Sequence, residues 1–167
     1  MAIQLTAEDA RQSLTAHVEG KGVEAYLKHG PHIGWEQLQH MLSDPTCVRY
    51  PCEIRFDAEA LLPGEFAHPE PKGPNPEEGF VMYVHPAFAS RLEDAVPLVL
   101  YQLVAVNYGA FAAAEDAETF GAACLGLTRD EYYDLVCSLA DRAFGAPAET
   151  AAPAGKTCSC GGSGCGS

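Results

Sequence analysis

Three cysteines near the end of the chain form its most conspicuous group of reactive side chains. Cys158, Cys160 and Cys165 lie among glycines and serines in the segment CSCGGSGCGS. Such a backbone can wrap three thiolates round one ion, and thiolates favour zinc, copper(I) or an iron–sulfur cluster over hard cations. Because the paired C-x-x-C spacing of common zinc sites is missing, a fourth ligand must come from elsewhere in the chain or from a second chain.

The same segment has two other interpretations. Cysteines and serines among glycines are what cyclising enzymes convert to azoles, and residues 1–145 would then serve as the leader domain of a precursor with a modified tail. The segment also fits a cysteine-rich end without a fixed partner. Metal or cluster binding is the leading hypothesis, and the other two remain open.

Four further cysteines and the histidines are weaker candidates. Cys47 and Cys52, in CVRYPC, are close enough in sequence to chelate a metal, but Cys52 falls on the apolar face of a strand, which favours core burial. Cys124 and Cys137 fall on apolar helical faces, so we expect them to be structural. His85, at the end of an apolar strand, is the histidine best placed to act as a ligand or base, with a structural role as the alternative.

Composition restricts the classes of partner. The chain has 167 residues, with 23 acidic against 10 basic side chains and a formal net charge of −13. This charge repels phosphate, so we expect neither a nucleic acid nor an anionic membrane as partner. The first residues, MAIQLTAEDARQ, lack the basic and apolar regions of a secretory signal, which predicts a cytoplasmic protein. In that compartment, cysteines are expected as thiols or metal ligands before disulfides.

The longest apolar stretch predicts the element on which the others pack. Residues 91–125 include a helix that we expect to begin near Asp94, to carry Pro97 in its first turn and to end before Gly109. This helix is apolar nearly all round, so we expect it inside the domain. Residues 117–125 repeat apolar and small side chains every three or four positions, which predicts a second packed helix.

Shorter helices flank this centre. Thr6 is a helix cap, but Gly20 and Gly22 are expected to interrupt or end the first helix, and a second helix covers residues 35–42. At the other end, residues 128–145 predict a last helix with a capping box at its start and a glycine at its end.

Alternating and apolar runs predict a small sheet. Residues 52–57 alternate between apolar and charged side chains, as in a half-exposed strand, and residues 80–84 are apolar on both faces, as in an inner strand. A short strand is expected around Phe66. The segment PEPKGPNPEEG, residues 69–79, has four prolines and two glycines and is expected to be an irregular loop.

This order of elements has a counterpart in a known family. A strand FVMYVHP leads into a helix with LVLYQLVAVNYG, and the next helix reads EDAETFGAACL. Residues 80–125 thereby resemble the zincin metallopeptidases of the ImmA/IrrE type, in which a strand precedes an HExxH helix and an acidic residue opens the following helix. The residues that carry the resemblance occupy packing positions: Ala117, Phe120, Ala122 and Leu125.

The catalytic positions of the zincin pattern are changed. Tyr101 and Ala105 stand where the two zinc-binding histidines would be, Gln102 replaces the general base, and Asp116 occupies the place of the third ligand. An amide cannot take a proton from water, so the resemblance implies a scaffold without zincin catalysis.

In that case, the former cleft would be able to bind a peptide or partner. The alternative is that its polar side chains satisfy hydrogen bonds inside a helical layer. The residues that would line the cleft are Tyr101, Gln102, Asn107, Asp116 and His85.

Together these features predict one α+β domain at residues 1–145, followed by a flexible Ala/Pro/Gly/Cys-rich tail at residues 146–167. We expect a sheet of about three strands packed with about five helices around a buried central helix. The leading function is a non-enzymatic accessory protein that docks on a client protein and delivers a thiophilic metal or an iron–sulfur unit. A modified precursor and an inactive zincin-like interaction module remain as alternatives.

Overall fold

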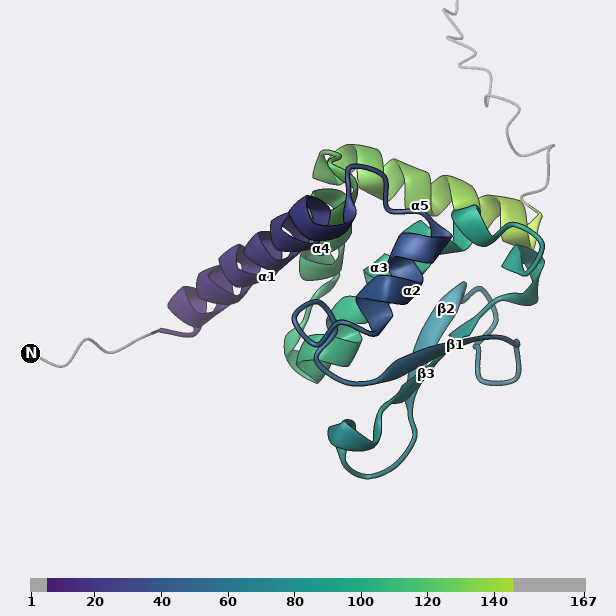
Figure 1. Cartoon of the computed structure of the whole chain (residues 1–167), viewed down its shortest axis with the longest axis horizontal. Helices are drawn as coiled ribbons and strands as arrows, with labels where there is room; N and C mark the ends of the chain where they lie inside the picture. The colour runs from purple at the N-terminus through teal and green to yellow at the C-terminus, as the bar shows by residue number, and fades with distance from the viewer. Residues whose placement is uncertain (1–5, 146–167) are drawn as a thin grey trace, which may run out of the picture.

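A computed structural model describes residues 6–145, in which helices and one small sheet share a single core (Figure 1). The expected α+β class is confirmed. The predicted tail at residues 146–167 lies outside the described residues. The helices are α1 (Ala7–His29), α2 (Trp35–Leu42), α3 (Leu92–Tyr108), α4 (Ala114–Leu125) and α5 (Arg129–Phe144). The strands are β1 (Cys52–Phe56), β2 (Ala67–Pro71) and β3 (Phe80–Val84).

Helix α3 is the centre of the domain, as its sequence predicts. It contacts α2, α4, α5 and both β2 and β3, so it lies between the other helices and the sheet. The helix begins at Leu92, two residues before the expected start, so Pro97 lies in its second turn rather than its first. Its end agrees with the prediction, because Gly109 follows with a φ of 59° that favours glycine.

The sheet has the strand order β1-β3-β2, with β3 parallel to β1 and antiparallel to β2. The predictions for β1 as a half-exposed strand and for β3 as the inner strand are confirmed. The prediction of a wholly irregular segment at residues 69–79 is wrong, because β2 extends through Pro69 to Pro71. Proline is tolerated there because β2 is an edge strand, in which alternate backbone N–H groups have no partner strand.

Helix α1 corrects the expected break at Gly20 and Gly22, because it continues without interruption to His29. It packs along α4, and Gly22 lies directly against Phe120 and Ala123 of that helix. A Cβ atom at position 22 would lie 2.6 Å from the Cβ of Ala123 and 2.8 Å from the carbonyl oxygen of Phe120. The glycine therefore permits close helix packing and does not end the helix.

Helix α4 ends, and helix α5 begins, at the cap residues predicted from the sequence. Gly126 closes α4 in the left-handed conformation, and Thr128 and Glu131 form the capping box of α5. Tyr132 of α5 is wholly buried against Gly121, and its hydroxyl donates a 2.6 Å hydrogen bond to the carbonyl oxygen of Pro97. This contact joins α5 to both α4 and α3.

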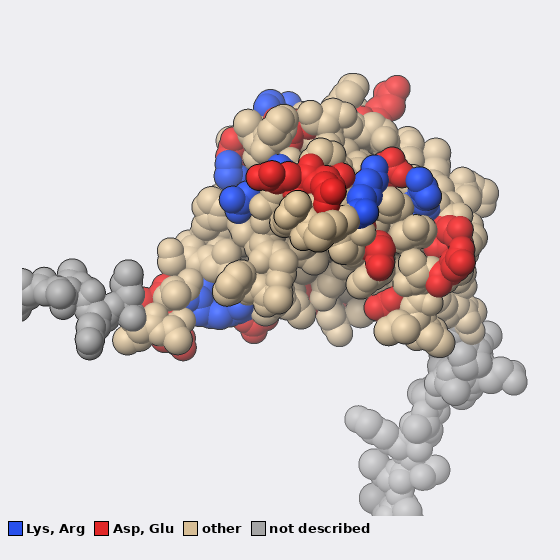
Figure 2. All heavy atoms as spheres, turned by 90° about the horizontal axis from the view of Figure 1, so that it is seen from below, with Lys and Arg blue, Asp and Glu red and all other residues tan. Residues whose placement is uncertain are grey.

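Charged side chains of both signs lie close together on one face of the domain. Figure 2 shows lysine and arginine side chains next to aspartate and glutamate side chains, without a broad basic area on the face in view. No helix among residues 6–145 has the length and apolar character needed to cross a membrane.

The two glycines of α1 provide a matched test of the helix packing. Gly20→Ala faces open space, so we expect it to stabilise the fold by about 0.5–1 kcal/mol through helix propensity. Gly22→Ala should instead destabilise it by about 1–3 kcal/mol, because the added methyl group overpacks the α1–α4 contact. Urea unfolding of both variants measures the difference, and equal stabilisation of the two would contradict this packing.

Candidate metal centre

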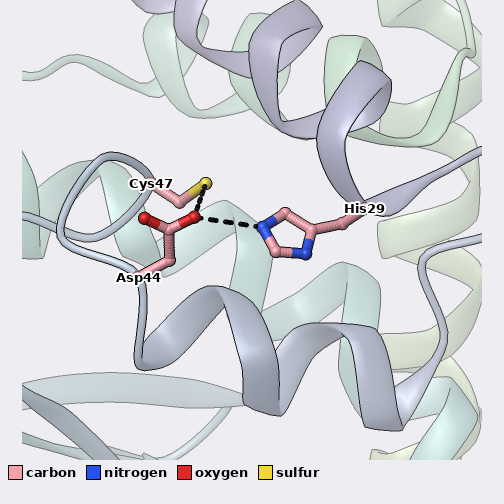
Figure 3. Close-up of side chains that lie close together, drawn as sticks. All are labelled: His29, Asp44 and Cys47. Atoms are coloured by element: carbon pink, nitrogen blue, oxygen red, sulfur yellow. Dashed lines mark hydrogen bonds and ion pairs between the residues drawn. The ribbon is translucent and has the colours of Figure 1, made fainter.

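Three side chains of different ligand types converge where the end of α1 meets the loop after α2 (Figure 3). His29 is the last residue of α1, and Asp44 and Cys47 belong to the loop. The Nε2 atom of His29 lies 3.3 Å from Oδ2 of Asp44, and Sγ of Cys47 lies 3.6 Å from the same oxygen. All three ligand atoms lie within 4.8 Å of one another.

The loop sequence orients the Asp44 carboxylate. Its Oδ1 atom accepts hydrogen bonds from the backbone N–H of Thr46 at 3.0 Å and from the Thr46 hydroxyl at 2.7 Å. The backbone carbonyl of Asp44 accepts from the N–H groups of Cys47 and Val48, which closes the turn. This Asx-type turn occupies Oδ1 and leaves Oδ2 facing His29 and Cys47.

Asn107 of α3 anchors the other end of the loop. Its side-chain amide donates to the carbonyl of Cys47 at 3.1 Å, and its Oδ1 accepts from the backbone N–H of Arg49 at 2.8 Å. Asn107 is 7% exposed, and its bond to Cys47 is buried while its bond to Arg49 is partly buried. The position of Cys47 therefore depends on the central helix.

The carboxylate and the thiol of the site differ in charge at neutral pH. The hydrogen bonds from Lys28 and Thr46 hold the pKa of Asp44 well below its usual range, so the carboxylate is ionised at neutral pH. Burial raises the pKa of the Cys47 thiol. These side chains thus include a carboxylate and a protonated thiol, and such a thiol is a poor nucleophile that can serve as a metal ligand only when it loses its proton.

The spacing is compatible with a tetrahedral ion. With zinc bonds of about 2.0–2.3 Å, neighbouring ligand atoms of a tetrahedral site are roughly 3.3–3.7 Å apart. The distances from Asp44 to His29 and Cys47 already fall in this range. Three protein ligands leave a fourth position for water or an external ligand. Lys28 also contacts Oδ2, so a bound cation would have to displace its ammonium group.

The polar residues expected to line one cleft are separated in the structure. Tyr101 and Gln102 border a pocket of ≈ 260 Å³ beside the start of α4. Tyr101 packs edge-on against Phe66. Burial raises the pKa of Tyr101. Asn107 instead bridges the Cys47 loop, as described above.

Asp116 and His85 also lie outside that pocket. The wholly buried Asp116 carboxylate accepts hydrogen bonds from Arg11 and Thr15 of α1, which is a structural contact. The Nδ1 atom of His85 accepts a hydrogen bond from the backbone N–H of Ala87, and its ring packs on Phe144. These five residues therefore do not surround a common cleft.

Sequence reasoning identified only part of the converging site. Cys47 was a candidate, but its expected partner Cys52 lies in β1, where burial raises the thiol pKa to about 11. His29 and Asp44 were not among the predicted site residues. The S-D-P-T-C run could have indicated Asp44, because an Asx turn there places a carboxylate beside a cysteine, but this run carries no signal for His29. The tail residues Cys158, Cys160 and Cys165 lie outside the described residues.

Comparison with known protein families, with curated proteins and with solved structures finds no match to this chain. The resemblance of residues 80–125 to zincins therefore stays a prediction.

Replacing Asn107 should destabilise the domain and loosen the loop. Asn107→Ala leaves the buried carbonyl of Cys47 and the partly buried N–H of Arg49 without these partners, so we expect a loss of about 2–4 kcal/mol in the free energy of unfolding. Denaturant unfolding measures the loss. Gln102→Ala on the same helix is the control, because Gln102 is only half-buried, and similar losses in both variants would contradict the anchoring role.

The stabilising effect of Asp44 should depend on pH. Because the folded-state pKa lies below the ordinary value of 3.8, the contribution is present above that value and is lost as pH falls towards the folded-state pKa. We expect Asp44→Asn to lower the free energy of unfolding by about 1 kcal/mol at neutral pH, since Lys28 is half exposed. Unfolding measured from neutral to acid pH should show the two proteins converging, and a constant difference would contradict the assignment.

Proposed function

We propose that this chain is a non-enzymatic accessory protein that holds a thiophilic metal ion at His29, Asp44 and Cys47. The observation that supports the proposal is the convergence of an imidazole, a carboxylate and a thiol from two separate segments, with all ligand atoms within 4.8 Å of one another. Zinc is the ion that best fits this mixed ligand set, because it accepts nitrogen, oxygen and sulfur ligands in tetrahedral geometry.

The surroundings favour reversible binding over permanent retention. For a metal ion to bind, the Cys47 thiol must lose its proton. The Asp44 carboxylate must also give up its ion pair with Lys28 before it can bind the metal. Both steps lower the affinity for metal. A site of this kind releases its ion more readily than a closed site of four thiolates, which suits delivery to another protein.

The C-terminal cysteines provide a second set of donors in this proposal. Cys158, Cys160 and Cys165 would receive the ion or present it to a client protein, and three thiolates would favour copper(I) or an iron–sulfur unit as alternative cargo. We place this function in the cytoplasm, where such thiols remain reduced.

Metal titration of full-length variants tests the proposal. Cobalt(II) serves as a spectroscopic probe for zinc, because a cysteine ligand gives a thiolate-to-cobalt charge-transfer band. A chain with all three tail cysteines replaced by serine should bind about one equivalent through the His29 site. Adding Cys47→Ser to that chain should remove the band. Cys137→Ser, at a half-buried position in α5, is the matched control and should leave it unchanged.

The affinity should also rise with pH. Because binding releases the proton of a thiol whose pKa burial has raised, the apparent affinity should increase about tenfold per pH unit near neutrality. Metal binding that is insensitive both to pH and to Cys47→Ser would contradict the proposed site. Losses of water that map to the tail in intact mass would support the modified precursor instead.

A further inference from the structure

Strand β1 presents an edge of the sheet without a partner strand. Among the described residues it pairs only with β3, which lies on one of its two sides. The carbonyl of Pro51 accepts from Phe80, and the N–H of Asp57 donates to Val84. Backbone groups alternate in direction along a strand, so positions 51, 53, 55 and 57 face β3. The N–H and C=O groups of Cys52, Ile54 and Phe56 therefore face outwards.

The opposite edge of the sheet is protected. Just beyond the two ends of β2, the backbone N–H of Lys72 donates to the carbonyl of Gly79, and the carbonyl of Phe66 accepts from the backbone N–H of His85. The odd-numbered positions of β2 therefore face outwards. Two of these positions are Pro69 and Pro71, which have no N–H to offer another strand. The open edge of β1 has no proline, so the two edges of this sheet differ in their capacity to pair.

The apolar face of the sheet is also incomplete at β1. In the register of the two strands, Ile54 lies beside Met82 and Phe56 lies beside Val84. Met82 and Val84 are wholly buried, whereas Ile54 and Phe56 remain partly exposed. A further strand beside β1 would cover the remaining apolar surface.

The sequence of β1 is complementary to a second copy of itself. In an antiparallel pair centred on Ile54, that residue faces its own copy, and Glu53 of each chain faces Arg55 of the other. The outward direction of the Ile54 backbone groups allows this register to form direct hydrogen bonds. Glu53 and Arg55 are 44% and 59% exposed and already pair within one chain at 2.7 Å. Opposite charges at non-hydrogen-bonded positions stabilise such cross-strand pairs.

We propose that β1 is a homodimer interface in which two chains join their sheets through antiparallel pairing about Ile54. The proposal uses none of the metal-centre residues, so its failure would leave the proposed metal function untouched. A strand of five residues buries little area, so the dimer should be weak and depend on concentration.

Charge reversal on the strand tests the register. In Glu53→Arg, arginines would face arginines across the two-fold axis, and in Arg55→Glu, glutamates would face glutamates. We expect each single variant to raise the dimer dissociation constant at least about tenfold relative to the wild type. The double variant Glu53→Arg/Arg55→Glu should restore association. A mixture of the two single variants should also form a heterodimer, because every cross-strand pair is then opposite in charge.

Analytical ultracentrifugation of the full chain, over roughly a hundredfold range of concentration, measures these constants. Reductant and chelator prevent association through cysteines or metal. Lys72→Ala is the control, because Lys72 contacts Glu53 within the chain at 3.0 Å but lies outside β1. Circular dichroism checks that each variant folds. The proposal is overturned if the wild type stays at 17.8 kDa throughout, or if the single variants associate as the wild type does.

Discussion

A wholly buried carboxylate, that of Asp116, determines how the first helix packs on the rest of the domain. Each oxygen has a defined partner: the guanidinium of Arg11 and the backbone N–H of Ala113 bind one, and the hydroxyl of Thr15 binds the other. A buried charge without partners would be costly, so α1 must keep this register on α4. Gly22 then lets the two helices approach closely farther along. The position of His29, at the far end of α1, follows from both contacts.

The second half of the candidate metal centre depends on the central helix. Asn107 holds the loop that carries Cys47, and the Asx turn within the loop holds Asp44. The two halves meet because α1 and α3 are both fixed against α4. The site is therefore a product of tertiary packing, although each of its segments has a local cause. The same packing gives the three side chains different charges, so metal binding at this site would be coupled to release of a proton.

Much of the fold could be predicted from the sequence, because caps and apolar periodicity are local signals. The end of α3, the capping box at Thr128 and the inner position of β3 were all predicted correctly. The predictions failed at Gly22 and at Pro69, because each residue usually ends an element. Gly22 stays within α1 because α4 packs closely against it. Pro69 stays within β2 because that strand lies at the edge of the sheet. The site could not be predicted because its histidine and its loop are brought together only by long-range contacts.

X-ray absorption at the zinc edge, on the chain with its three tail cysteines replaced by serine and loaded with one equivalent of zinc, tests the central claim most directly. A site at His29, Asp44 and Cys47 predicts a first shell with one sulfur at about 2.3 Å and nitrogen or oxygen neighbours at about 2.0–2.1 Å. Two or more sulfur neighbours would place the ion on cysteines other than Cys47 alone and contradict the account. A first shell without sulfur would contradict it as well, since Cys47 would then not bind the metal.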